Sequence, residues 1–211
     1  MAEIKIAVLV SGGGTNLQAL LDAQARGEIP GGRISLVVSS RPGVYALERA
    51  ARAGVPAEVV ARKDFSDTDA FCGALLDTLR RHDTGLVILA GFLSILNETF
   101  IRTYPNRIIN IHPSLIPSFC GKGYYGLKVH EEALARGVKV TGATVHFVNE
   151  EPDGGPIILQ KAVDILPGDT PEALQKRVME QAEWKLLPRA AMLFCAGRLS
   201  VEGRTVRITE E

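Results

Sequence analysis

Asn110 and His112 are the residues whose types and spacing most directly suggest chemistry. They lie two apart in the segment Ile-Ile-Asn-Ile-His-Pro-Ser, and residues two apart on a strand share one face. Pro113 cannot donate a ladder hydrogen bond and favours extended geometry at His112, so the strand is predicted to end where both polar side chains emerge. An amide and an imidazole that converge on one point can donate to a developing oxyanion. The alternative is a strand followed by a turn, with His112 hydrogen-bonded at the edge.

A glycine-rich segment follows the first predicted strand. Residues 11–16 read Ser-Gly-Gly-Gly-Thr-Asn. Glycines let the backbone approach a ligand closely, and the amides at a helix N-terminus attract phosphate. The segment lacks the lysine of a Walker A loop and the spacing of a dinucleotide fingerprint, which favours a single phosphomonoester. The alternative is a tight strand-to-helix turn that needs glycine only for packing.

Asp153 lies in a Pro-Asp-Gly-Gly-Pro turn. Turns commonly contain aspartate for local hydrogen bonding, which is the simplest interpretation of this residue alone. In an open α/β sheet, however, ligands bind beyond the carboxyl ends of the strands. We therefore expect the glycine-rich segment, the Asn110/His112 strand end and the Asp153 turn to meet at one edge of the sheet.

The remaining histidines and cysteines give weaker signals. His146 has apolar neighbours and is interpreted as a structural or supporting residue, whereas His82 and His130 are interpreted as helix-surface residues. The spacing of His112, His130, His146 and Asp153 matches no compact metal motif, so no metal is expected. Cys120 has no surrounding Cys/His signature, and no GxSxG elbow of a serine hydrolase occurs.

Short Val/Ile-rich runs alternate with amphipathic stretches in the first half, which predicts parallel strands joined by helices. Thr15 or Asn16 is expected to cap the first helix, and Ser66 or Asp67 the third. The predicted strands cover residues 5–10, 33–39, 57–61, 86–90 and 107–111, and the predicted helices cover residues 16–26, 44–53, 67–81 and 98–104.

The second half begins with an irregular loop rich in Gly and aromatic residues. A helix is predicted over 127–135, and strands over 140–148 and 155–163, whose short connection predicts antiparallel pairing. A long helix is predicted over 171–196, capped by Thr170 with Pro171 in its first turn, and a hairpin over 198–208. The predicted fold class is α/β, a doubly wound, mostly parallel Rossmann-like sheet that an antiparallel pair extends.

The amino-acid composition and the length limit the partners, the compartment and the domain organisation that we expect. The chain has 211 residues with 24 Lys+Arg and 24 Asp+Glu, so nucleic acid and anionic membrane surfaces are not expected partners. Cys72, Cys120 and Cys195 lie far apart, which fits no disulfide framework and predicts a reducing cytoplasm. No signal peptide or spanning segment is recognised. The length predicts one domain, 1–211, with a phosphate-binding half, 1–111, and a second half, 112–211.

Five segments together resemble the phosphoribosylglycinamide formyltransferases, a folate-dependent family of the formyltransferase superfamily, over nearly the whole chain. The likeness is carried by Ser-Gly-Gly-Gly-Thr-Asn-Leu-Gln-Ala-Leu-Leu, Leu-Ala-Gly-Phe-Leu, Ile-Asn-Ile-His-Pro-Ser-Leu-Ile-Pro, Gly-Ala-Thr-Val-His-Phe-Val and Asp-Gly-Gly-Pro-Ile-Ile-Leu-Gln. The Asn-x-His and Asp elements are shared across the superfamily, whereas the glycine-rich segment is more specific to this family.

The resemblance implies transfer of the formyl group of 10-formyltetrahydrofolate, a co-substrate, to the amine of glycinamide ribonucleotide, with no metal. Asn110, His112 and Asp153 would be catalytic, with Asp153 raising the pKa of His112 to keep it a protonated donor. Ribonucleotide-binding residues would be Gly13, Gly14, Thr15, Asn16 and Glu183. Folate-binding residues would be Leu93, Ser94, Ile95, Leu96, Ile101, Ile108, Asn110, Val148, Asn149 and Asp153. The resemblance also suggests a cis bond at Ile116-Pro117.

Several positions depart from the family pattern. Leu93-Ser94 replaces the Met-Arg of many relatives, which removes a cation near the folate, and Glu183 is followed by Trp184 rather than by histidine. The loop 118–126 is longer than in some relatives. The alternative function is a formyltetrahydrofolate deformylase, in which water replaces the amine; that enzyme usually carries an extra N-terminal domain, and none is expected here. The protein is expected to be a monomer or a homodimer.

Overall fold

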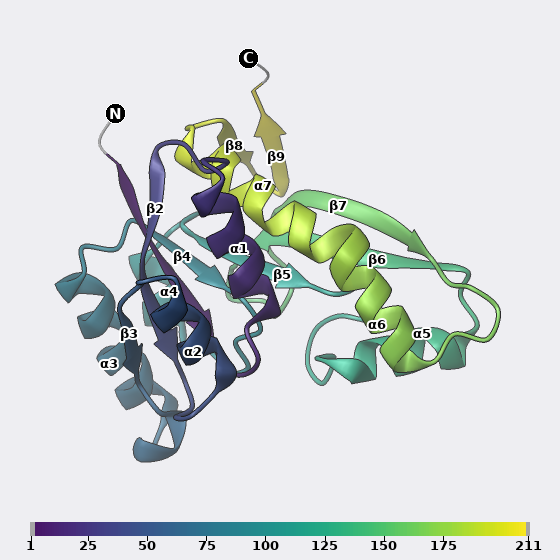
Figure 1. The fold of residues 1–211 in the computed structure, drawn as a ribbon, viewed down its shortest axis with the longest axis horizontal. Helices are drawn as coiled ribbons and strands as arrows, with labels where there is room; N and C mark the ends of the chain where they lie inside the picture. The colour runs from purple at the N-terminus through teal and green to yellow at the C-terminus, as the bar shows by residue number, and fades with distance from the viewer. Residues whose placement is uncertain (1–2, 210–211) are drawn as a thin grey trace. The chain divides into compact units, whose positions relative to one another are not determined.

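The computed structural model describes residues 3–209, and the chain divides into two compact units, Met1–Ile109 and Asn110–Glu211. Figure 1 traces the helices and strands of both.

The first unit contains a parallel sheet in the order β3-β2-β1-β4. Its strands are β1 (Ile4–Val10), β2 (Gly32–Ser39), β3 (Ala57–Val59) and β4 (Leu86–Leu89). Every residue from Ile6 to Val10 is fully buried, as expected of a strand with both faces covered. The predicted strands are confirmed, although β3 ends two residues earlier than expected.

The helices of this unit are α1 (Thr15–Ala25), α2 (Tyr45–Arg52), α3 (Thr68–Arg81) and α4 (Glu98–Thr103), with a short 3₁₀ helix η1 (Arg62–Asp64). α1 and α2 lie against each other and against β2 (Figure 1). Asp67 caps α3 as predicted, because its carboxylate accepts from Ala70 N at 2.8 Å. The predicted cap of α1 was wrong: the helix begins after Gly14, whose φ of 73° makes the turn from β1 without a side-chain cap.

The second unit begins within β5 (Ile108–His112). It contains α5 (Leu127–Arg136), β6 (Val140–Phe147), β7 (Ile157–Asp164) and a terminal hairpin, β8 (Leu199–Glu202) and β9 (Thr205–Ile208). β6 and β7 pair antiparallel, as predicted, and β9 joins β7 at one parallel pair, Thr205 with Ile157.

One continuous helix was predicted over residues 171–196. The structure instead has three consecutive helical segments over residues 171–195. α6 (Pro171–Val178) and α7 (Trp184–Cys195) are joined by a π-helix, η2 (Met179–Glu183). Thr170 caps α6 and Pro171 occupies its first turn, as predicted. The π-helix and α7 pack on β6 and β7 (Figure 1). Periodicity alone does not predict such a widened turn, which is frequent at functional sites.

The fold class is the predicted one, a mostly parallel α/β architecture with antiparallel strands toward the C-terminus. Among residues 3–209, no helix combines the length and the hydropathy needed to cross a membrane.

Candidate active site

Asn110 and His112 share one face at the end of β5, as predicted. His112 is only 5% exposed, however, so its ring lies in the protein rather than projecting into solvent. The loop after the strand contains the expected cis bond at Ile116-Pro117. Thr144 on β6 fixes this loop, because its hydroxyl donates to Ser114 O at 2.7 Å and accepts from Ile116 N at 3.1 Å.

Both ring nitrogens of His112 have neighbours. Nε2 lies 2.9 Å from Phe119 O, and since a carbonyl only accepts, Nε2 carries a hydrogen. Nδ1 lies 3.5 Å from Asp153 Oδ2. In the neutral ring the Nδ1 lone pair therefore faces a carboxylate, and a proton arriving at Nδ1 would be shared with Asp153.

Asp153 lies in the loop between β6 and β7, residues 148–156, called here the Asp153 loop. Its φ of 54° is the left-handed region, which costs a non-glycine residue free energy and is concentrated at functional sites. Gly121 N donates to Oδ2 at 2.8 Å and Asn110 Nδ2 to Oδ1 at 3.4 Å. The predicted trio of Asn110, His112 and Asp153 is thus brought together within one unit.

His146 on β6 completes the cluster. Its Nδ1 lies 2.8 Å from Phe147 O and carries the hydrogen, so its Nε2 accepts from Asn110 Nδ2 at 3.1 Å. The same Nε2 lies 3.5 Å from Asp153 Oδ1. His146 therefore orients the Asn110 amide, which agrees with its interpretation as a supporting residue.

The electrostatics differ from the sequence-based expectation. Burial lowers the pKa of His112 and outweighs the Asp153 carboxylate, which raises it. Burial acts to raise the pKa of Asp153, but its contacts with His146, His112 and Gly121 lower that pKa below its usual value. The expected pairing is present, but the expected protonated His112 is wrong: at neutral pH the pair is a neutral imidazole beside a carboxylate.

His130 was predicted to lie on a helix surface, and that prediction is wrong. It is fully buried in α5, and neither ring nitrogen has a hydrogen-bond partner among the described residues. Burial, with a smaller effect of His112, lowers its pKa to about 4. His82 is half-buried at the end of α3, where Nε2 lies 2.6 Å from Glu58 Oε1.

The predicted phosphate-binding residues form the turn between β1 and α1 in the first unit. Ala46 N donates to Gly12 O at 3.2 Å, and Arg49 Nε donates to Gly13 O at 2.8 Å, so α2 holds two carbonyls of the turn. A Cβ at Gly14 would lie 2.7 Å from Ala46 Cβ. Both the positive φ and this close approach require glycine at position 14.

Glu183 is the last residue of the π-helix and is 6% exposed. A carboxylate with so little exposure is unusual unless it has a partner.

The predicted folate-binding residues fall in both units. In the first unit, Leu93 and Ile95 expose 50% and 78% of their surface, whereas Ile108 is fully buried; Leu96 and Ile101 are half-buried. In the second unit, Val148 and Asn149 begin the Asp153 loop and are half-buried.

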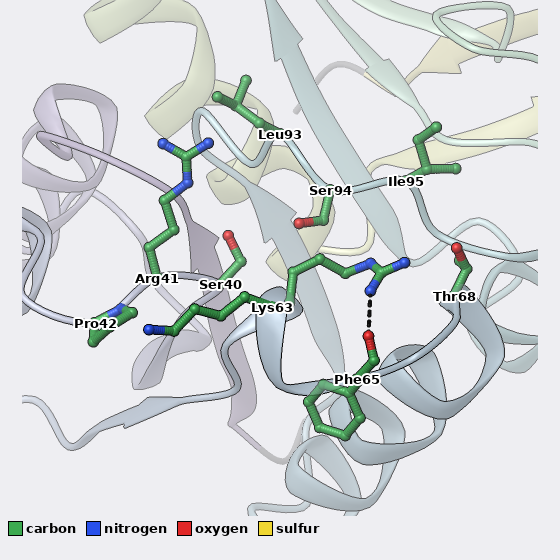
Figure 2. A pocket seen from close by; sticks show the side chains of 10 residues that line it. Ser40, Arg41, Pro42, Lys63, Phe65, Thr68, Leu93, Ser94 and Ile95 are labelled. Atoms are coloured by element: carbon green, nitrogen blue, oxygen red, sulfur yellow. Dashed lines mark hydrogen bonds between the residues drawn. The ribbon is translucent and has the colours of Figure 1, made fainter.

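Leu93, Ser94 and Ile95 line a pocket of about 780 Å³ in the first unit. Figure 2 shows that Arg41 and Lys63 reach it from separate segments. Its other lining residues are Ser40, Pro42, Arg62, Phe65 and Thr68. The Arg62 side chain is held by Phe65 O, to which Nη1 donates at 2.9 Å. Sequence reasoning missed these three cations, because they are divided between the loop after β2 and the 3₁₀ helix η1 and form no charged run.

The described residues 3–209 contain no group of three or more His, Cys, Asp or Glu side chains arranged to hold a metal ion. The absence of a resident metal stays a prediction. What the cluster offers is an amide donor, a proton acceptor and a carboxylate within hydrogen-bonding reach of one another.

Comparison with known proteins identifies the family of this chain. The Formyl transferase family model matches residues 4–191, which extend over both units. Phosphoribosylglycinamide formyltransferase of Haemophilus influenzae is 42% identical over 198 residues, covering 94% of this chain and 90% of that protein. The bovine trifunctional purine biosynthetic protein adenosine-3 is 43% identical over 99% of this chain, but the chain spans only 20% of that protein's length.

Comparison with solved structures identifies the same family. The structure of glycinamide ribonucleotide transformylase 1 from Symbiobacterium toebii matches with a TM-score of 0.93 at 47% identity, covering 99% of this chain and 95% of that one. A formyltetrahydrofolate deformylase from Pseudomonas syringae pv. tomato matches with a TM-score of 0.88 at 27% identity, covering 99% of this chain and 66% of that one. The chain belongs to the formyl transferase family, among the phosphoribosylglycinamide formyltransferases.

Proposed function

We propose that this chain transfers the formyl group of 10-formyltetrahydrofolate to the amine of glycinamide ribonucleotide, as a single formyltransferase domain built from both units. The observation that carries the proposal is the cluster at the end of β5, within one unit, in which Asn110 donates to Asp153 and His112 Nδ1 lies 3.5 Å from the same carboxylate. The names of its relatives supply the substrates, and the cluster supplies the chemistry.

Asn110 stabilises the oxyanion that forms when the amine attacks the formyl carbon. Its contact with Asp153 Oδ1 is long, 3.4 Å, whereas its contact with His146 is 3.1 Å. The longer hydrogen bond is the one that a substrate oxygen replaces, while His146 keeps the amide in orientation.

His112 and Asp153 accept the amine proton. The Nδ1 lone pair of neutral His112 faces the Asp153 carboxylate, so a proton taken up there is stabilised by a negative charge 3.5 Å away. Returning that proton to the folate nitrogen, directly or through water, completes the transfer. This role replaces the charged donor that the sequence suggested for His112.

The ribonucleotide phosphate binds to the turn of Gly13, Gly14, Thr15 and Asn16. Backbone amides at the beginning of α1 and the helix dipole both favour a phosphate there. Glu183, a buried acceptor, hydrogen-bonds the ribose hydroxyls.

Two groups of residues bind the folate, one at its pterin and one at its glutamate tail. The Asp153 loop, from Val148 and Asn149 to Asp153, contacts the polar edge of the pterin, and the half-buried Leu96 and Ile101 supply apolar surface, whereas the fully buried Ile108 has no surface to contribute. The glutamate carboxylates of the folate tail bind in the pocket beside Leu93, Ser94 and Ile95, where Arg41, Arg62 and Lys63 supply the positive charge. In this way the pocket compensates for the cation that Leu93-Ser94 lacks.

Replacing Asn110 by Ala tests the central assignment. Loss of one oxyanion donor is expected to lower kcat by about 100-fold to 1000-fold, while calorimetry still detects ribonucleotide binding. Ile109→Val, on the opposite face of β5, controls for packing and should keep activity. Unchanged transfer by Asn110→Ala would show that Asn110 is not catalytic.

An absorbance assay of formyl loss from 10-formyltetrahydrofolate separates the transferase from the deformylase. Turnover only in the presence of glycinamide ribonucleotide is expected. Equal turnover in water alone would instead identify a hydrolase. The cytoplasmic location and the monomeric or dimeric state stay predictions.

A further inference from the structure

Arg204 lies in the turn of the β8–β9 hairpin, a part of the chain to which the proposed function gives no role. Its Nη2 donates to Gly154 O at 3.1 Å, and its Nη1 lies 3.9 Å from Glu151 Oε2. Both acceptors belong to the Asp153 loop. We propose that Arg204 is a positioning residue that ties the Asp153 loop to the C-terminal hairpin and thereby keeps Asp153 beside His112. The proposal rests on the proposed function of Asp153.

The Asp153 loop needs such support because Asp153 itself is strained. A left-handed non-glycine residue persists only where its surroundings hold it, at a cost on the order of 1 kcal/mol or more. On one side of Asp153, its carboxylate is held by Gly121 N and Asn110. On the other side, Arg204 donates to the carbonyl of the next residue, Gly154 O.

The backbone bond from Phe147 N to Pro156 O, at 2.9 Å, fixes the end of the loop to β6, but the hydrogen bonds nearer Asp153 complete internal turns. Gly154 N donates to Glu151 O at 2.9 Å, and Glu151 N donates to Asn149 Oδ1 at 3.1 Å. Neither contact fixes the loop to another element. A Cβ at Gly154 would collide with the Glu151 carboxyl group, so glycine there leaves room for Glu151 to fold back toward Arg204.

The hairpin is a suitable anchor, because Arg204 precedes Thr205, the residue that pairs with Ile157 at the beginning of β7. The backbone of Arg204 is thus fixed to the strand into which the Asp153 loop runs. Its guanidinium then reaches back over the loop and bonds a carbonyl next to the strained residue. The four residue pairs of the hairpin hold its two strands together, which limits how far the turn can move.

The test compares Arg204→Met, which keeps an unbranched stem, with Arg204→Lys and with Arg207→Met. Arg207 is the matched control: it lies in the same hairpin and pairs with Glu202 at 2.8 Å, not with the Asp153 loop. Because the contacts are solvent-exposed, Arg204→Met is expected to lower kcat only about threefold to tenfold. KM for the ribonucleotide should stay unchanged, Arg204→Lys should recover part of the loss, and Arg207→Met should behave as the unmodified chain.

Two further measurements distinguish a loss of Asp153 positioning from a general loss of protein stability. Arg204→Met should move the acidic limb of the kcat profile to lower pH, since a displaced carboxylate no longer raises the pKa of His112, whereas a structural effect would leave the limb in place. Hydrogen exchange should increase at residues 153–155 and not in β6. Glu151→Gln, which keeps the hydrogen bond to Gly154, should show a smaller change of the same kind and serves if Arg204→Met does not fold.

Equal kcat, pH profile and exchange in Arg204→Met and Arg207→Met would overturn the proposal. The exchange measurement needs no activity, so it keeps its meaning even if Asn110→Ala shows the proposed function to be wrong. Conversely, full transfer activity with unchanged exchange in Arg204→Met would reject this inference alone.

Discussion

At the scale of single residues, the active-site cluster works through the state of His112. Burial and the Asp153 carboxylate act on its pKa in opposite directions, and burial is the larger effect. A lone pair on Nδ1 therefore faces Asp153 at neutral pH. The sequence indicated which residues lie close together. The burial of the His112 ring depends on the elements packed around it, so the sequence could not show whether its pKa is raised or lowered.

The lowered pKa of His112 predicts how the rate of formyl transfer depends on pH. Neutral His112 accepts the proton, so kcat should fall as the pH falls through the His112 pKa, which lies below its ordinary value of 6.5. Asp153→Asn removes the charge that raises this pKa, so the acidic limb should move to still lower pH while kcat drops. Steady-state rates over a pH series, with an NMR titration of His112, measure both. An acidic limb above pH 6.5 in the unmodified chain would contradict the neutral-imidazole role.

Lys63 allows a second prediction, on the pocket of Figure 2. Reversing its charge by Lys63→Glu places a carboxylate where the folate tail is proposed to bind, so KM for the folate should rise about threefold to tenfold with kcat unchanged. Arg80→Glu is the control, because Arg80 is exposed on α3 beside Asp77 and outside the pocket. Equal KM values for the two variants would remove the pocket from the folate site.

At the scale of elements, strands and helices were largely predictable, whereas their ends and interruptions were not. The Val/Ile runs predicted the parallel strands, and Asp67 and Thr170 marked the beginnings of α3 and α6. Thr15 and Asn16 have good capping side chains, yet Gly14 is the N-cap of α1, because the backbone must turn sharply against α2. The π-helix that ends at Glu183 has no periodic pattern by which the sequence could predict it.

Gly14 gives the prediction that belongs to the β1–α1 turn. Gly14→Ala adds a Cβ at a φ of 73° and 2.7 Å from Ala46 Cβ. Left-handed backbone costs alanine about 1–2 kcal/mol, and the clash adds to it. We expect a lower free energy of unfolding in urea and weaker ribonucleotide binding. Gly12→Ala is the control, since a Cβ there meets no heavy atom within 4 Å and Gly12 has no positive φ. Equal losses in the two variants would refute this account of the turn.

At the scale of the whole molecule, none of the three thiols is prepared to act as a nucleophile. Burial raises the pKa of Cys72 and raises that of Cys195 to about 12. Cys120, in the loop beside the cluster, has its pKa raised by burial and then by the negative charges of Asp153 and Glu151. Since the thiolate is the reactive form, formyl transfer through a thioester is disfavoured in both units.

The formyl group should therefore pass directly from the folate to the amine in a ternary complex. Incubation of the chain with 10-formyltetrahydrofolate alone should leave its intact mass unchanged, and addition of the ribonucleotide should consume the folate without a lag. Cys120→Ser tests the half-buried thiol beside the cluster and should keep kcat, because its hydroxyl can still donate to Pro117 O as the thiol does at 3.3 Å. A protein that gains the mass of one formyl group, and passes it to the ribonucleotide after the folate is removed, would establish a covalent intermediate instead.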